Sequence, residues 1–298
     1  MSLPTAGVVT ALWTPTDADG RVQPAELKAN VKFLRERGIH GLMVLGSTGE
    51  FLLLSQETRR QFLEMVRGEA GPLPIIANIS DVRPAAVAEF GRFARELGLA
   101  AVALLPPWYY PVAQPDLVEF FVRAGEAAGL PLFLYNFPER TGNRLGLETI
   151  AAIADRVPVG GLKQSGGEFD YHGPLVALGR QKGFAVFTGG ENQLAEAMAL
   201  GVAGCVSGLV NALPELVLEV YNAVKAGTPE KARVARERLK DLAGRLEAVA
   251  FPLNVRAAIV ARGLATGEFK TPISAATRTR HDRLVSELRA LYRDWKLL

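Results

Sequence analysis

The chain has 298 residues, of which 49% are hydrophobic and 22% charged, and its formal net charge is +3. These values are ordinary for a globular chain, and without a dense lysine and arginine tract they give no support to nucleic-acid binding. The single cysteine, Cys205, excludes an internal disulfide framework. Three scattered histidines, none at a metal-ligand spacing from another, argue against a histidine metal site.

The chain shows no signal for a membrane or for export. No stretch approaches the ~18 consecutive apolar residues that a membrane-spanning helix needs. The first residues, Met1-Ser2-Leu3-Pro4, lack the basic region and apolar core of a signal peptide. We therefore expect a cytoplasmic protein with neither a membrane nor a nucleic acid as partner.

Short apolar runs alternate with helical patterns along the chain. The predicted strands cover residues 8–13, 41–46, 74–79, 100–105, 132–136, 159–164, 184–188 and 204–207. The predicted helices that follow them cover residues 24–37, 55–67, 83–97, 115–128, 147–155, 170–181, 192–200 and 214–225. The strands are apolar on both faces, which is typical of a parallel sheet covered by helices.

Eight strand–helix units with a period of ~25–30 residues predict an α/β fold of the closed (β/α)8 type, a TIM barrel. A doubly wound sheet is the alternative, but no GxGxxG follows the first strand. Helical patterns at 229–248, 252–265 and 279–296 predict a C-terminal helical extension. We expect residues 1–225 to form the barrel and residues 226–298 to pack on it.

Lys163 ends the sixth predicted strand, after the apolar run Val159-Gly160-Gly161-Leu162. In a barrel of this type the chemistry lies at the C-terminal ends of the strands. Lysine is rarely buried, and apolar surroundings favour its neutral amine, a nucleophile that forms Schiff bases with ketones. A surface lysine at a strand end is the alternative interpretation.

Tyr135 ends the fifth predicted strand, and Arg140 follows it in the next loop. A phenol at the mouth of a barrel can pass protons, and an arginine fork can bind a carboxylate. A core tyrosine with a surface arginine is the alternative. The aromatic loop after the fourth strand contains Tyr109 and Tyr110. It covers a pocket, supplies a catalytic phenol, for which Tyr109 is the candidate, or packs between subunits.

Two glycine turns end other strands. Gly46-Ser47-Thr48-Gly49-Glu50 follows the second strand, and its backbone N–H groups can face an anion such as a carboxylate. Thr188-Gly189-Gly190-Glu191 follows the seventh and allows the backbone to approach a ligand closely. An amine, a phenol, hydroxyls and two glycine turns at strand ends of one barrel together favour a covalent amine mechanism.

With these residues the chain resembles the dihydrodipicolinate synthase / N-acetylneuraminate lyase family over nearly its whole length. The most specific segments are Gly46-Ser47-Thr48-Gly49-Glu50, Tyr135-Asn136-Phe137-Pro138 with Thr141-Gly142, and Gly161-Leu162-Lys163. The resemblance implies a TIM barrel with a helical extension and a homotetramer built as a dimer of dimers. It also implies a class I lyase that joins or cleaves pyruvate, or a related 2-oxo acid, and an aldehyde, without metal or cofactor.

The resemblance also implies roles for individual residues. Lys163 would form the Schiff base, and Tyr135 would relay protons to and from the substrate. Ser47 and Thr48 would bind the carboxylate of pyruvate and join the relay.

Other implied roles concern the pocket and its neighbours. Gly189 and Val206 would line the pyruvate pocket. Tyr109, with Tyr110 as its rival, would reach into a neighbouring subunit.

The aldehyde partner stays open at this point. Arg140 matches a second carboxylate site, which favours a dihydrodipicolinate synthase-like condensation with an acidic aldehyde. Ser165, in Lys163-Gln164-Ser165-Gly166-Gly167, looks closer to 4-hydroxy-2-oxoglutarate and 2-keto-3-deoxy sugar acid aldolases. An aldolase or dehydratase is therefore one alternative. A metal-dependent barrel enzyme and a non-catalytic 2-oxo acid sensor are others.

Overall fold

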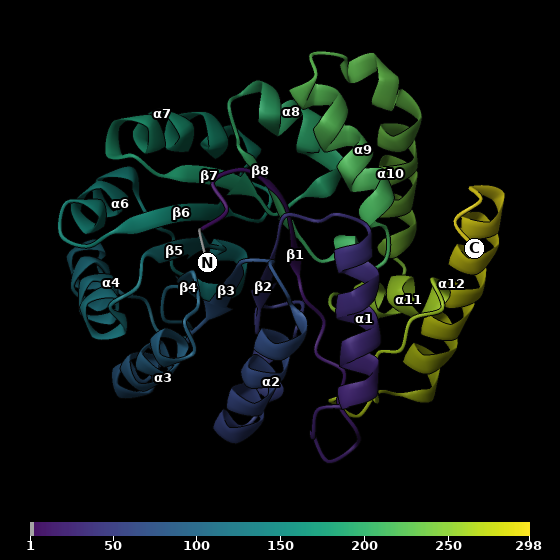
Figure 1. Cartoon of the computed structure of the whole chain (residues 1–298), viewed down its shortest axis with the longest axis horizontal. Helices are drawn as coiled ribbons and strands as arrows, with labels where there is room; N and C mark the ends of the chain where they lie inside the picture. Colours follow the sequence, from purple (N-terminus) through teal and green to yellow (C-terminus); the bar gives the residue numbers. More distant parts are fainter. Residues whose placement is uncertain (1–2) are drawn as a thin grey trace. The chain divides into compact units, whose positions relative to one another are not determined.

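The computed structural model describes residues 3–298 and contains the predicted barrel (Figure 1). Eight strands follow one another in chain order and close into a ring. They are β1 (Gly7–Ala11), β2 (Gly41–Val44), β3 (Ile75–Asn78), β4 (Ala101–Leu104), β5 (Leu132–Asn136), β6 (Val159–Gln164), β7 (Ala185–Thr188) and β8 (Gly204–Ser207). Lys163 is the one charged residue in these strands.

Helices connect and follow the strands, as predicted. They are α1 (Pro24–Glu36), α2 (Gln56–Glu69), α3 (Pro84–Glu96), α4 (Gln114–Ala128), α5 (Pro138–Thr141), α6 (Leu147–Ala154), α7 (His172–Lys182), α8 (Leu194–Ala199), α9 (Pro214–Lys225), α10 (Arg233–Leu246), α11 (Leu253–Ala261) and α12 (Ala275–Asp294). Proline in the first turn starts several of them, where its missing N–H costs nothing. Among residues 3–298, none of these helices has the length and apolarity needed to cross a bilayer.

The chain divides into two compact units. The first comprises residues 3–9, 40–43 and 72–207 and carries β3 to β8 with α3 to α8. Within it α3 and α4 lie side by side (Figure 1). They approach closely because Gly91 has no side chain: a Cβ there would lie 2.8 Å from the Cβ of Ala128.

The second unit comprises residues 10–39, 44–71 and 208–298 and carries α1, α2 and α9 to α12. Asn211 ties its segments together, because its amide accepts from the backbone N–H of Trp13 and donates to the carbonyl of Ala11. The expected division at residue 225 stays a prediction.

Several helix boundaries differ from the predicted ones. The last helix begins at Ala275, before the predicted residue 279, because the Ser274 hydroxyl caps it by accepting from the N–H of Thr277. The preceding helix, α11, ends at Ala261 rather than 265, near Gly263 with φ +83°. The four-residue helix α5 was not predicted, since so short a segment carries no periodicity.

Candidate active site

The first unit brings Lys163 and Tyr135 into contact. Lys163 Nζ donates a hydrogen bond of 3.1 Å to the Tyr135 hydroxyl and lies 4.2 Å from the centre of its ring. Both residues are buried, with 5% and 2% of their surface exposed. The amine and the hydroxyl therefore meet in the interior of this unit, away from bulk solvent.

The strand register creates this contact. Tyr135 on β5 pairs with Lys163 on β6, and Asn136 pairs with Gln164 one position further on. The amide of Asn136 donates to Gln164 Oε1 at 2.7 Å, so the next position of the ladder is fixed by side chains as well as by backbone. Two parallel neighbours in register direct their side chains to the same face, and the amine and the phenol therefore meet.

Ser165 and Gly189 pack against each other beyond the ends of β6 and β7. The N–H of Gly189 donates to the Gln164 carbonyl at 2.7 Å. A Cβ at Gly189 would lie 2.1 Å from Ser165 Oγ and 3.0 Å from Ser165 Cβ, so a larger residue would require the Ser165 side chain to move. Val206 lies fully buried in β8 of the same unit.

Glu191 is an acidic group for which the sequence alone predicts no role beyond its place in a turn. It follows Gly190 after β7, and its carboxylate accepts a hydrogen bond from the Ser207 hydroxyl. The residue is partly exposed but its carboxyl group is enclosed, and burial raises its pKa, while Ser207, its own backbone and the Lys163 charge act in the opposite direction. The sequence does contain one signal for a functional carboxylate here, because Glu191 directly follows the glycine pair at the end of a strand.

Cys205 carries no reactive thiol. It is fully buried in β8, and burial raises the pKa of its thiol, an effect that the nearby Glu191 reinforces. Since the thiolate is the reactive form, Cys205 is an inert core residue.

Arg140 lies exposed near the end of α5, with its guanidinium 5.8 Å from the Phe137 ring. The same short helix holds the loop after β6, because the Glu139 carboxylate accepts from the N–H of Gly167 at 2.6 Å. Gly166 has φ +99°, a conformation that favours glycine. The segment after Tyr135 and the segment after Lys163 are therefore linked.

Tyr109 and Tyr110 form a ring pair on the surface, 83% and 72% exposed, with centroids 4.8 Å apart. Tyr109 has φ +82°, which is uncommon for a bulky residue. Asn143 holds this loop, since its amide donates to the carbonyls of Pro107 and Tyr110 and accepts from the N–H of Val112. The tyrosines are thus displayed by a restrained backbone.

Ser47 and Thr48 belong to the second unit, in the turn after β2. Thr48 is 5% exposed, and Ser47 is half-buried. Gly208 packs on Thr48, because a Cβ there would lie 2.8 Å from Thr48 Oγ1. The Ser47 carbonyl accepts from the N–H of Glu50 at 3.1 Å and closes the turn.

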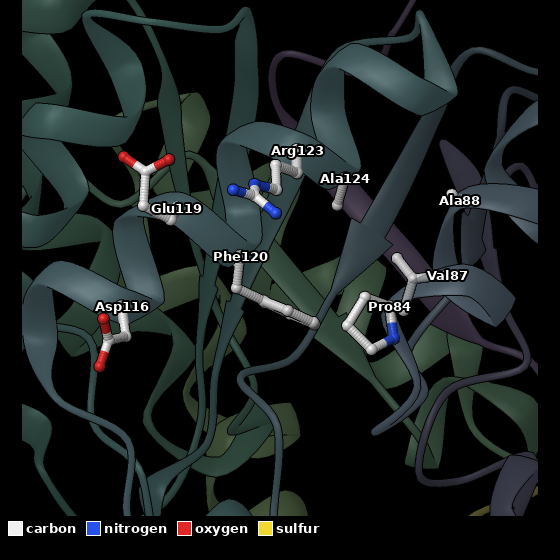
Figure 2. Close-up of a pocket in the computed structure, with 8 residues that line it drawn as sticks. All are labelled: Pro84, Val87, Ala88, Asp116, Glu119, Phe120, Arg123 and Ala124. Atoms are coloured by element: carbon white, nitrogen blue, oxygen red, sulfur yellow. The ribbon is translucent and has the colours of Figure 1, made fainter.

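A separate hollow of about 410 Å³ lies between α3 and α4 (Figure 2). Phe120 of α4 points there toward Pro84 of α3, and Asp116, Glu119 and Arg123 supply its charges. The Glu119 carboxylate is already bound by Arg156, whose hydrogen bond lowers the pKa of Glu119. Neither Lys163 nor Tyr135 lines this hollow.

No metal-binding cluster is found in the part of the chain that the structure describes. Within residues 3–298, no three His, Cys, Asp or Glu side chains are grouped so that they could hold an ion.

The sequence profile of the Dihydrodipicolinate synthetase family matches residues 4–291. A 4-hydroxy-tetrahydrodipicolinate synthase of Methanopyrus kandleri is 32% identical over 288 residues, which cover 96% of each chain.

Two solved structures extend the comparison. The chloride-inhibited dihydrodipicolinate synthase of Acinetobacter baumannii, complexed with pyruvate, is similar with a TM-score of 0.86 and 28% identity, covering 96% of this chain and 99% of that one. A 2-keto 3-deoxygluconate aldolase of Picrophilus torridus is similar with a TM-score of 0.84 and 25% identity, covering 90% and 97%. The chain belongs to the Dihydrodipicolinate synthetase family of class I lyases.

Proposed function

We propose that the protein is a pyruvate-dependent Schiff-base lyase in which Lys163 is the nucleophile. The observation that carries the proposal is the hydrogen bond of 3.1 Å between the buried Lys163 amine and the Tyr135 hydroxyl. A binding site alone needs neither an enclosed amine nor a phenol beside it. This pairing therefore favours a catalyst over a non-catalytic 2-oxo acid sensor.

The chemistry follows from these two groups. The neutral Lys163 amine attacks C2 of pyruvate, a C–N bond forms, and Tyr135 passes a proton to the carbonyl oxygen. Water then leaves, and the resulting iminium withdraws electrons so that C3 loses a proton and an enamine forms. C3 of the enamine adds to the carbonyl carbon of an aldehyde, and hydrolysis of the new iminium releases the product and the free amine. Cleavage is the same sequence in reverse.

The remaining residues have assigned roles in this proposal. Ser47 and Thr48 bind the carboxylate of pyruvate with their hydroxyls and extend the proton relay. Gly189 and Val206 line the pocket around the methyl and keto carbons. Gly189 packs directly against Ser165, the residue that this proposal places at the substrate.

Two candidate reactions differ in the aldehyde partner. Exposed Arg140 favours an acidic aldehyde and a synthase reaction, because its fork of donors matches a carboxylate. The likeness to a 2-keto 3-deoxygluconate aldolase supports the second candidate, an aldolase or dehydratase of 4-hydroxy-2-oxoglutarate or 2-keto-3-deoxy sugar acids, with Ser165 as a substrate ligand. Steady-state kinetics with pyruvate plus aspartate semialdehyde, against cleavage of the two aldol substrates, separates them: cleavage without condensation excludes the synthase.

We also propose a homotetramer in which Tyr109, or Tyr110, reaches a neighbouring copy. Two large rings exposed on a restrained loop support this assignment. Light scattering of the protein and of its Tyr109→Ala/Tyr110→Ala variant tests it: the variant should dissociate, and an unchanged mass would exclude these rings from the interface. The cytoplasmic location stays a prediction.

The proposed function is tested by trapping. Sodium borohydride added with pyruvate should reduce the imine and leave a 1-carboxyethyl group on Lys163, located by peptide mass spectrometry. Lys270, another lysine with an enclosed side chain, is the internal control, since it is held by Glu50. No adduct, or an adduct on Lys270, would refute the proposal. Trapping without turnover of any aldehyde or aldol substrate would identify a sensor.

A further inference from the structure

A buried ion pair in the second unit lies at the end of the turn that contains Ser47 and Thr48. Lys270 Nζ lies 2.6 Å from Glu50 Oε2, and the two side chains are 2% and 8% exposed. Glu50 is the last residue of the turn, whereas Lys270 comes from the segment between α11 and α12, 220 positions away. A buried pair of this kind constrains two segments strongly, because either charge alone would be left without compensation.

Lys270 is itself held in place on its other side. Its Nζ lies 4.6 Å from the centre of the Trp13 ring, a cation–π arrangement. Trp13 is fixed at both ends, since its backbone N–H donates to Asn211 Oδ1 at 3.0 Å and its indole N–H donates to the Thr266 carbonyl at 2.9 Å. The Lys270 amine therefore contacts a Trp13 ring whose own position is fixed by hydrogen bonds.

The turn is one that needs support. Glu50 has φ +54°, in the left-handed region that a residue with a side chain adopts only under constraint. Gly49 is pressed against the preceding segment, because a Cβ there would lie 2.9 Å from Thr14 Oγ1 and 3.0 Å from the Leu12 carbonyl oxygen. These contacts restrict the conformation of the turn, and the ion pair with Lys270 adds a further restraint at its end.

We propose that Lys270 and Glu50 are positioning residues that fix the turn of Ser47 and Thr48 so that its hydroxyls meet the substrate carboxylate. This inference rests on the proposed function for the identity of the ligand. The fixing of the turn is independent of that function. Small errors in positioning lower catalytic efficiency steeply, so loss of the pair should weaken the use of pyruvate more than it weakens the fold.

The test uses the double variant Lys270→Met/Glu50→Gln, which removes both charges and leaves no lone buried ion. Lys270→Arg, which keeps the charge, is the conservative variant. Arg262→Met/Glu215→Gln is the matched control, because it removes ion pairs elsewhere in the same unit: Glu215 lies 2.5 Å from Arg262, whose side chain is 5% exposed, and 2.5 Å from Arg37. All variants are checked for cooperative thermal unfolding before use.

Two measurements give the result. Hydrogen exchange of the ligand-free protein should be faster at residues 46–51 in the Lys270→Met/Glu50→Gln variant, and unchanged there in the control. The pyruvate concentration that gives half-maximal borohydride trapping of Lys163 should rise by roughly ten- to hundredfold, with the amount trapped at saturation unchanged. The Lys270→Arg variant keeps the charge, so its exchange rate at residues 46–51 and its pyruvate requirement should stay close to those of the unaltered protein.

The outcomes separate the two proposals. Unchanged exchange at residues 46–51 in the folded double variant would overturn the positioning role, as would faster exchange with an unchanged pyruvate requirement. An equal rise of the half-maximal pyruvate concentration in the control variant would also overturn the positioning role, since the rise would then come from lost stability alone. Absence of trapping in the unaltered protein would instead refute the proposed function, and the exchange data would still decide whether the pair fixes the turn.

Discussion

Lys163 and Tyr135 are register partners on adjacent strands, and their amine and hydroxyl lie 3.1 Å apart. Because both side chains come from the strand ladder rather than from loops, their separation is set by backbone hydrogen bonds on either side. The Tyr135 ring also stacks on Phe137, with centroids 6.0 Å apart. The pair is therefore preorganised before any substrate binds.

Tyr135→Phe should remove the proton relay and keep the ring packing. We expect the rate of pyruvate C3 hydrogen exchange in D₂O to fall about 10²–10⁴-fold, the range typical of a lost general acid–base group, with little change in melting temperature. NMR of the pyruvate methyl signal measures the exchange without an aldehyde. Phe133→Leu, which alters a ring on the same strand, is the control. A Tyr135→Phe variant that exchanges at the normal rate would exclude the phenol from the relay.

Gly189→Ala should damage the site through a defined steric clash. The new Cβ would lie 2.1 Å from Ser165 Oγ, and such overpacking costs about 1–3 kcal/mol. We expect a lower melting temperature and weaker pyruvate trapping. Ser165→Gly removes the clashing atoms, so the double variant Gly189→Ala/Ser165→Gly should recover much of both. If the double variant traps no better than Gly189→Ala, the clash is not the cause.

Arg140→Met should change the choice of aldehyde but not the Schiff base. We expect kcat/KM with an aldehyde that carries a carboxylate to fall about 10–100-fold, the value of one lost charged hydrogen bond. Activity with glyceraldehyde and trapping with pyruvate should be unchanged. Arg144→Met is the control, since Arg144 already binds Glu168 at 2.8 Å. An equal loss with both aldehydes would show that Arg140 does not select the acid.

The barrel could be predicted because its strands are short, apolar on both faces and regularly spaced, and every predicted strand has a counterpart in the structure. Helix ends were less predictable, since a single hydroxyl, that of Ser274, decides where the last helix begins. The short helix α5, which carries Arg140 and Glu139, has no sequence signal of its own.

The candidate site was predictable by residue type and not by geometry. A lysine at the end of an apolar strand and a tyrosine at the end of the previous one indicate the chemistry. Their contact depends on the strand register, which includes an irregularity between Leu132 and Phe133 that no sequence rule specifies. Whether Glu191 turns its carboxylate inward toward Ser207 likewise depends on tertiary packing.

Glu191 makes stability depend on pH in a predictable direction. Burial raises the pKa of its carboxyl above the ordinary value of 4.5, so the folded protein keeps a proton that the unfolded chain releases. In the window that runs upward from pH 4.5 to the raised value, the folded state binds more protons, and stability therefore falls as pH rises. Below this window both states are protonated, and the contribution of Glu191 to stability is fully present.

Glu191→Gln should remove this dependence, because its amide is neutral at every pH and still accepts from the Ser207 hydroxyl. We expect the melting temperature of the variant, relative to the unaltered protein, to rise as pH increases through the window between 4.5 and the raised pKa, and to be constant below that window. Glu247→Gln, at an exposed position, is the control and should show no such trend. Thermal scans at several pH values measure the difference. A constant difference would mean that the pKa of Glu191 is the same in the folded and unfolded chain. A difference that shrinks as pH rises would mean that the Lys163 charge outweighs burial.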